Sequence, residues 1–118
     1  MANELRLTSV MRFVKGDTDI SLGEAVFVDV TGSRYTRQIQ NVGTTEEALD
    51  LVDITSPGYI LVVNRDRTNF VSLRRATGEG NLIKIRPGKF ALFELEATAP
   101  FAIANTAACN VEILLIET

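Results

Sequence analysis

The chain has 118 residues, of which 46% are hydrophobic and 23% are charged, and its formal net charge is −3. This composition is typical of one globular domain and excludes a disordered chain. Because the balance is acidic and Lys and Arg form no cluster, the sequence lacks the basic face that binding of DNA or RNA requires. A domain of this size buries only a modest core, so association with other chains is a natural way to stabilise it.

The residue types that carry most enzyme chemistry are absent or isolated. There is no histidine, which removes the commonest general base and metal ligand. Cys109 is the single cysteine, and its apolar surroundings predict a small buried hydrophobe rather than a nucleophile. Residues 78–80, Gly-Glu-Gly, lack the lysine and hydroxyl residue of a phosphate-binding loop. We therefore expect no catalytic residue, no cofactor, no metal and no small-molecule substrate, and we predict that the protein is not an enzyme.

The N-terminal sequence MANELRLTSV carries neither a charged leader nor a long apolar block, so it does not resemble a secretion signal. No stretch approaches the roughly 20 apolar residues of a membrane-spanning helix. We expect a protein that is made soluble and that has no membrane partner.

Short apolar runs separated by Gly, Pro, Asn and Asp recur along the chain, as in antiparallel β-proteins. In residues 4–13 apolar side chains occupy most odd positions and polar ones most even positions, which predicts a half-buried strand. The acidic turn at residues 16–19 ends it. Further strands are expected at residues 24–30 and 35–42, the second a polar edge strand with Ile39 as its main inward side chain.

The middle of the chain begins with an ambiguous segment. Residues 44–47 predict a brief helical turn, because a threonine can cap it and two glutamates would lie near its positive end. This turn would lead into a strand near residues 49–54. Pro57 and Gly58 then suit a type II turn, in which proline fixes one torsion and glycine accepts a positive φ.

The next two runs, residues 59–64 and 69–74, flank the polar residues 65–68 and predict a β-hairpin. The second Pro-Gly pair, residues 87–88, predicts another turn. The remaining strands are expected in the apolar runs at residues 82–86, 89–96, 100–106 and 110–118.

These elements predict an all-β fold, an antiparallel β-sandwich with at most one short helical turn. Eight to ten strands are expected, and eight is the number of a jelly roll, although other sandwich topologies remain open. We expect a single sandwich domain over residues 1–118, in which residues 1–14 form an N-terminal strand or arm.

Some of the predicted strands are apolar on both faces. Phe90 and Leu92 alternate with apolar residues of the opposite face, and so do Leu114 and Ile116. A sheet with one wet face should instead show a polar residue at every second position. We predict that these four residues line a contact between subunits, since exposed apolar patches usually mark contact surfaces. Cover by loops of the same chain is the alternative.

The last two thirds of the chain resemble small structural proteins of tailed bacteriophages. The resemblance rests on four stretches: Pro-Gly-Tyr at residues 57–59, Asn-x-Asp-x-x-Asn-Phe-Val at 64–71, Arg-Pro-Gly-Lys-Phe-Ala at 86–91 and Pro-Phe-Ala-Ile-Ala-Asn-Thr-Ala-Ala at 100–108. It implies a capsid decoration or cement protein, a small β-sandwich that binds the outer surface of the head shell as a homo-oligomer.

The resemblance further implies that the partners are other copies of the chain, as a dimer or trimer, and the shell of the major capsid protein. The expected location is the capsid surface of the virion, after synthesis in the host cytoplasm. The residues expected to bind the shell lie on the N-terminal arm: Leu5, Leu7, Met11 and Phe13.

The alternative is a tail- or fibre-associated module that contacts the host surface or its glycans. Glycan binding would have to use loops, because the chain has no Trp and only two Tyr, and Tyr59 is expected to pack in the core.

Overall fold

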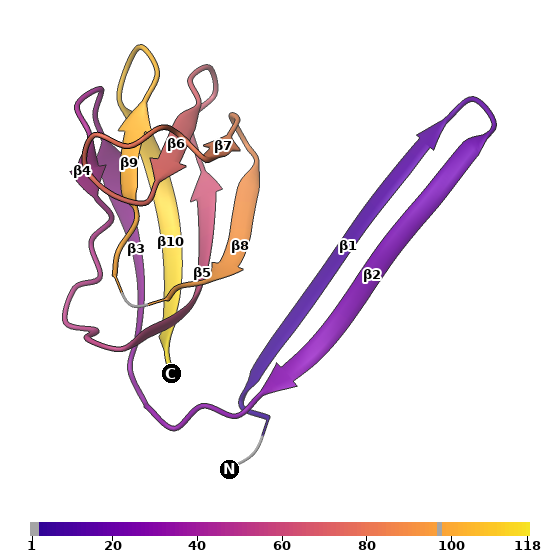
Figure 1. Ribbon diagram of the computed structural model, residues 1–118, viewed down its shortest axis with the longest axis horizontal. Helices are drawn as coiled ribbons and strands as arrows, with labels where there is room; N and C mark the ends of the chain where they lie inside the picture. Colours follow the sequence, from indigo (N-terminus) through magenta and orange to yellow (C-terminus); the bar gives the residue numbers. More distant parts are fainter. Residues whose placement is uncertain (1–2, 97) are drawn as a thin grey trace. The chain divides into compact units, whose positions relative to one another are not determined.

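The computed structural model describes residues 3–96 and 98–118 and consists of ten β-strands, without a helix in these ranges. All strand pairs are antiparallel. The chain divides into two compact units, Met1–Gly32 and Ser33–Thr118 (Figure 1). The all-β antiparallel fold class predicted from the sequence is confirmed.

The first unit is a long β-hairpin. Strand β1 (Leu5–Lys15) pairs with β2 (Thr18–Val28) along its full length, from Leu5 opposite Val28 to Lys15 opposite Thr18. Gly16 and Asp17 form the two-residue turn, and Gly16 has φ 57°, which a type II′ hairpin turn requires of its first central residue. The strand predicted at residues 4–13 is present, whereas β2 begins six residues before the predicted start.

The second unit is a sandwich of two four-stranded sheets, which face each other in Figure 1. We refer to them as the β3-β10-β5-β8 sheet and the β4-β9-β6-β7 sheet, after their strand order. The first sheet consists of β3 (Tyr35–Val42), β10 (Cys109–Glu117), β5 (Pro57–Asn64) and β8 (Phe90–Glu94). The second sheet consists of β4 (Glu47–Ala48), β9 (Phe101–Ala104), β6 (Val71–Arg74) and β7 (Ile83–Ile85).

Most connections in the sandwich cross from one sheet to the other. Along the chain, β3, β5, β8 and β10 belong to one sheet and alternate with β4, the pair β6 and β7, and β9 of the other. The jelly-roll assignment stays a prediction, and the features in its favour are the eight strands and these crossing connections.

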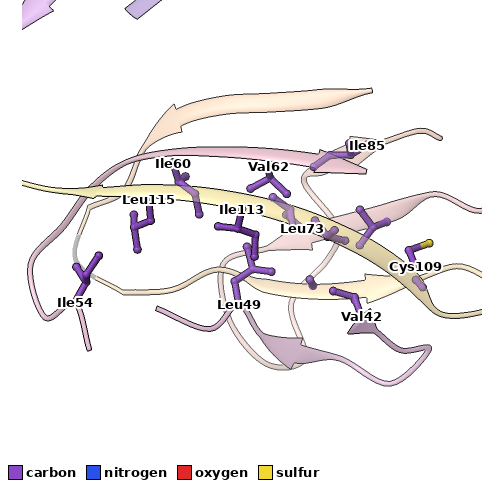
Figure 2. Packing of buried hydrophobic residues seen from close by; sticks show 14 residues of the cluster. Val42, Leu49, Ile54, Ile60, Val62, Leu73, Ile85, Cys109, Ile113 and Leu115 are labelled. Carbon is purple, nitrogen blue, oxygen red and sulfur yellow. The ribbon is translucent and has the colours of Figure 1, made fainter. Parts of the chain in front are cut away.

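The core lies between the two sheets (Figure 2). Along β10, Val111, Ile113 and Leu115 are completely buried, and they meet Val71 and Leu73 from the opposite sheet in one cluster. The buried positions alternate with less buried ones, as the pleat of a strand requires. Cys109 is buried in the same cluster, as its apolar surroundings predicted.

The predicted single sandwich over residues 1–118 differs from the observed division. The strands of the N-terminal segment pair only with each other, and the two sandwich sheets begin at Tyr35. The predicted arm, residues 1–14, is one strand of this hairpin as far as it is described. The alternation in residues 4–13 indicated a two-faced strand correctly, but alternation alone does not tell which sheet a strand joins.

The predicted hairpin around residues 65–68 is wrong. β5 pairs with β10 and β8, so both of its edges are occupied, and β6 belongs to the other sheet. The connection between them crosses the sandwich. The buried side chain of Asn64 fixes this crossing, because its Nδ2 donates to the carbonyls of Asn69 and Ile85 at 3.0 and 2.9 Å, and its Oδ1 accepts from the amide of Asp66 at 2.9 Å.

The two Pro-Gly pairs have different roles. Pro87 and Gly88 form the predicted turn: Gly88 has φ 74°, and the amide of Lys89 donates to the carbonyl of Arg86 at 2.9 Å. Pro57 and Gly58, in contrast, are the first residues of β5, and the predicted type II turn is wrong there. Gly58 allows a close approach instead, since a Cβ at this position would lie 2.9 Å from the carbonyl oxygen of Ile116.

The helical turn predicted at residues 44–47 and the strand predicted at 49–54 are also wrong. The segment contributes only the two-residue strand β4 and then follows β3 through side-chain contacts. Gln40 donates to the carbonyl of Ala48 at 3.1 Å and accepts from the amide of Asp50 at 2.9 Å. These contacts outweigh a helical preference that is marginal for so short a segment.

Candidate binding surfaces

The β3-β10-β5-β8 sheet has an outer face that is largely apolar. Residues opposite each other in neighbouring strands point to the same side, so the register defines rows across the sheet. The first row is Tyr35, Ile116, Tyr59 and Glu94. The second row is Arg37, Leu114, Leu61 and Leu92, and the third is Ile39, Glu112, Val63 and Phe90. We call these twelve residues the outer face.

All four residues predicted to line a subunit contact lie on the outer face. Phe90 is 67% exposed, and Leu92, Leu114 and Ile116 are partly exposed. None of the four belongs to the buried core, whose cluster takes the alternate residues of the same strands. The structure therefore brings together four residues that are up to 26 positions apart in the sequence.

Several outer-face residues were not predicted. Leu61 and Val63 lie at its centre, and the signal for them was available, because residues 59–63 are apolar on both faces, as in the strands that were singled out. Tyr59 was expected in the core and Ile39 was expected to point inward, and both predictions are wrong. Ile39 is 65% exposed on the edge strand β3.

One charged cluster interrupts the apolar surface. The carboxylate of Glu112 accepts from Arg37 at 2.8 Å and from Arg65 at 2.7 Å. Hydrogen bonds from Arg65 and then from Arg37 hold the pKa of Glu112 below its usual value. Two guanidinium groups share one carboxylate, so the cluster carries one positive charge in excess.

A negative charge lies at the opposite edge of the outer face. Glu94 is exposed on the edge strand β8 and lies opposite Tyr59 in the register. Burial raises the pKa of the Tyr59 hydroxyl, and the charge of Glu94 and a hydrogen bond to it raise this pKa further. The outer face is therefore an apolar strip with a positive cluster toward β3 and a carboxylate at β8.

The hairpin presents a second apolar surface. The predicted shell-binding residues Leu5, Leu7, Met11 and Phe13 point to one face of β1, where the register places them opposite residues of β2. These partners are Val28, Val26, Leu22 and Ile20. Only Ser9, opposite Glu24, interrupts the apolar series. We call these eight apolar residues the hairpin face, and five of them are exposed: Met11, Phe13, Ile20, Leu22 and Val26.

The opposite face of the hairpin is more polar. Arg12 and Asp19 lie on it, and the Arg12 side chain donates to the Asp19 carboxylate at 3.1 and 2.9 Å. The hairpin is only partly amphipathic, because Val10, Val14 and Phe27 are also exposed on this opposite face. The partner residues in β2 were missed although the signal was available, since Ile20 and Leu22 alternate with Asp19 and Ser21.

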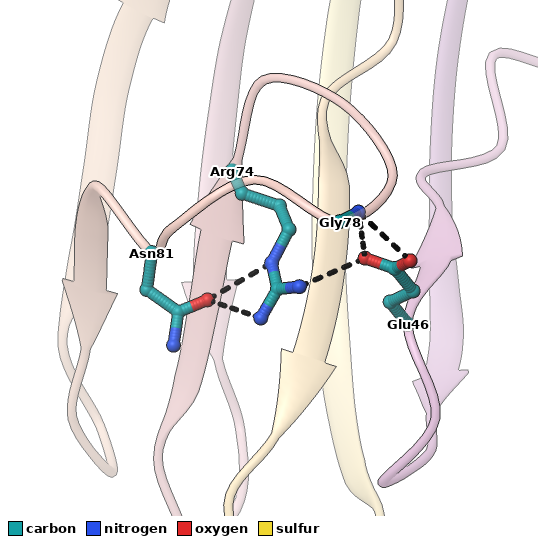
Figure 3. Close-up of polar contacts among 4 residues, drawn as sticks. All are labelled: Glu46, Arg74, Gly78 and Asn81. Atoms are coloured by element: carbon teal, nitrogen blue, oxygen red, sulfur yellow. Dashed lines mark hydrogen bonds and ion pairs between the residues drawn. The ribbon is translucent and has the colours of Figure 1, made fainter.

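The outer side of the β4-β9-β6-β7 sheet differs, because residues 75–82 run across it (Figure 3). Arg74 at the end of β6 donates to the carboxylate of Glu46 at 2.9 Å and to the side-chain oxygen of Asn81 at 3.0 and 2.6 Å. The backbone amide of Gly78 donates to the same carboxylate at 3.1 Å. These contacts fasten the segment to the residue that precedes β4.

Two of the stretches on which the resemblance rests, residues 64–71 and 100–108, contact each other at one end of the sandwich. Asp66 accepts from the amides of Thr68 and Asn69 at 3.0 and 2.7 Å, and these bonds lower the pKa of its carboxyl group. Thr106 donates to the side chain of Asn69 at 2.6 Å, and Asn105 accepts from the amide of Phe70 at 3.0 Å. These residues shape the connections between the two sheets.

A groove of about 330 Å³ lies beside β6, β7 and β8. Its walls are mostly apolar, with Leu73, Ile83 and Phe93 among them. The two arginines at the groove are already engaged, Arg74 with Glu46 and Arg75 with Glu79. The groove is therefore mainly an apolar surface, with the carboxylates of Glu94 and Glu96 among its lining residues.

The described residues contain no cluster of three or more Cys, Asp or Glu that would hold a metal ion. Burial raises the pKa of the Cys109 thiol, and the charge of Asp66 raises it further, so this thiol stays protonated at neutral pH. In the part of the chain that the structure describes, no helix is both long and apolar enough to cross a bilayer. Comparisons with protein-family models, with curated proteins and with solved structures find no match to this chain.

Proposed function

We propose that the protein is a non-enzymatic structural protein of a tailed-bacteriophage virion, a decoration protein that binds the capsid shell as a homo-oligomer. The observation that carries the proposal is the outer face, where Phe90, Leu92, Leu114 and Ile116 form one apolar surface with Leu61 and Val63. Each such side chain gains about 1.5–3 kcal/mol when it is fully buried. Contact with other copies of the chain supplies this burial. The resemblance of the last two thirds of the sequence supports the placement on a capsid.

The hairpin face is the proposed shell-binding surface. A two-stranded sheet has no interior of its own, and an isolated hairpin is only marginally stable in water. Eleven paired residues in each strand therefore gain stability when one side packs against another surface. The apolar side, with Met11 and Phe13, suits a hydrophobic track on the shell, and the Arg12–Asp19 pair stays in water.

The mechanism is mechanical. Interface buried across the joints between capsid subunits adds to the work needed to separate them, and stable contacts typically bury on the order of 1,200–2,000 Å². Many copies on one shell also act together, so each individual contact can be weak. This function requires no catalytic group, cofactor or metal.

The direct test is binding of purified protein to expanded, undecorated heads, measured by co-sedimentation. We compare the wild type with Leu22→Glu on the hairpin face and with Ser21→Glu, the neighbouring residue on the opposite face. We expect wild type and Ser21→Glu to bind and Leu22→Glu to lose most binding. A wild type that does not bind heads contradicts the proposal, and equal binding of the two variants contradicts the role of the hairpin face.

The alternative is a tail or fibre module that contacts the host surface. Electron microscopy of virions that carry a labelled copy distinguishes the two, because a decoration protein places the label on the head and a tail module places it on the tail.

A further inference from the structure

We propose that the outer face binds the outer face of a second copy about a two-fold axis that runs roughly along the strands. In this arrangement Glu94 of one copy meets Arg37 and Tyr35 of the other. The inference rests on the self-association in the proposed function and specifies its geometry. In a two-fold contact, the same patch of each copy must complement itself.

The apolar rows satisfy this condition. An axis along the strands, between β10 and β5, exchanges the two edges of the sheet, so that β3 lies over β8 of the second copy and β10 over β5. Residues that share a row are then opposed. Leu114 faces Leu61 of the second copy, Ile116 faces Tyr59, and Ile39 faces Phe90. These three contacts are between apolar or aromatic side chains. The other three pairs each include one charged residue: Glu94 opposite Tyr35, Arg37 opposite Leu92 and Glu112 opposite Val63.

The charges select this axis over the other possibility. Arg37 lies on the edge strand β3 and Glu94 on the edge strand β8, one row apart, which is about 7 Å along a strand. Exchanging the edges puts Glu94 of the second copy opposite Tyr35 and within the reach of the Arg37 side chain. An axis across the strands would instead leave each edge strand over its own counterpart, and these charges would not meet.

The charge balance supports the same pairing. Arg37 and Arg65 share the carboxylate of Glu112, which leaves one positive charge in excess on that part of the outer face. Glu94 of the second copy neutralises this excess positive charge. The two-fold axis repeats the contact at the opposite edge of the interface. Glu112 itself would face Val63 of the second copy and would keep its two arginine partners.

The area of the outer face limits the affinity that we expect for the dimer. Four strands about 4.8 Å apart and about five residues long cover roughly 19 by 17 Å. This flat area of roughly 300 Å² per copy lies below the approximately 800 Å² per partner of a standard interface. We therefore expect a weak dimer, with a dissociation constant in the micromolar range or above.

The test is sedimentation equilibrium of the full chain at low salt, from about 1 µM to about 1 mM, for the wild type and the charge-reversal variants. Glu94→Arg and Arg37→Glu each should raise the dissociation constant about tenfold or more, because the symmetry repeats each lost and each repulsive contact. The double variant restores the pair with its charges exchanged. We expect its dissociation constant to lie within about threefold of the wild type.

Arg65→Glu is the matched control. Arg65 shares Glu112 with Arg37 and follows β5 at the end away from Glu94, so its reversal disturbs the same cluster without approaching Glu94 of the second copy. Combined with Glu94→Arg, it should not restore dimerisation. Circular dichroism and urea unfolding check the fold of every variant. If a reversal unfolds the protein, the neutral variants Glu94→Gln and Arg37→Gln replace it, and each should weaken the dimer.

The outcomes are distinct. A wild-type dimer with rescue by the double reversal supports the geometry. A wild-type oligomer without rescue, or a trimer, overturns the two-fold pairing and leaves self-association through another surface. A monomer over the whole range overturns both the pairing and the proposed self-association, while binding to heads is decided separately by co-sedimentation.

Discussion

The two outer sides of the sandwich are built from strands of the same chain and are covered differently. On the β4-β9-β6-β7 sheet, Ser72 points away from the core, between the core residues Val71 and Leu73, yet it is only 4% exposed. On the β3-β10-β5-β8 sheet, Phe90 also points away from the core and is 67% exposed. Residues 75–82 cross the first sheet (Figure 3), whereas Tyr35 and Ile39 on the second sheet are as exposed as Phe90.

Strands that are apolar on both faces can be explained by contact with another subunit or by cover from loops of the same chain, and the two sheets differ in this respect. Cover by the same chain applies to one sheet, where the Glu46–Arg74 pair fastens a connecting segment. The exposed apolar outer face fits the proposed contact with a second copy, and we expect substitutions on it to change association more than folding.

The two sheets pack into one unit, and we expect the largest effect on stability from a substitution at the residue that joins them, Asn64. Asn64→Ala removes the side chain that bonds β5 to Ile85 in β7 and shapes residues 65–69. It leaves buried carbonyl groups without partners and creates a small cavity. We expect a loss of about 3 kcal/mol in the free energy of unfolding, measured by urea denaturation.

Asn41→Ala is the control for this substitution. Asn41 donates to the side chain of Asn110 at 3.0 Å on the exposed surface, so its loss should cost less than about 0.5 kcal/mol. Equal destabilisation by the two variants would show that Asn64 does not join the sheets.

A smaller loss of stability is expected from releasing residues 75–82 from the outer side of the β4-β9-β6-β7 sheet. Arg74→Ala removes a guanidinium that is 15% exposed and leaves Glu46, at 21% exposure, without its cation. We expect a loss of about 2 kcal/mol, below the cost of breaking a fully buried pair. Because the crossing segment loses its anchor, hydrogen exchange should speed up in β6 and β9, while β10 and β5 keep their protection.

The neighbouring residue supplies the matched control. Arg75 pairs with Glu79, but its side chain is 79% exposed, so Arg75→Ala should change stability by less than about 0.5 kcal/mol. Faster exchange throughout both sheets after Arg74→Ala would mean that the pair stabilises the whole sandwich rather than the cover of one side.

The sequence predicted the fold class and the apolar face because both depend on side-chain alternation within a strand. Val111, Ile113 and Leu115 point inward and Leu114 and Ile116 outward, as the period of two requires. Alternation does not tell which strands become neighbours. The predicted hairpin at residues 65–68 failed for this reason: the turn residues are present, but Asn64 directs the chain to the other sheet.

The helical turn predicted from local propensity is wrong because tertiary contacts determine the conformation of this segment. Glu46 suggested a helix N-terminus, and its carboxylate in fact binds Arg74 and the amide of Gly78, which no local pattern shows. The positions of the charged residues on the outer face could not be predicted from the sequence either. Arg37 and Glu112 are 75 positions apart, and only the pairing of β3 with β10 brings them together.

The smallest effect is expected from acidification of the outer face. Because Arg65 and Arg37 lower the pKa of Glu112 in the folded chain, its carboxylate stabilises the fold above the ordinary glutamate pKa of about 4.3. That contribution is lost as the pH falls through the lower pKa of the folded state. We expect Glu112→Gln to be less stable than the wild type at pH 7 and the two urea midpoints to converge toward pH 3. A difference that stays constant with pH would mean that Glu112 acts through packing rather than through its charge, and that its ion pairs with Arg37 and Arg65 do not stabilise the fold.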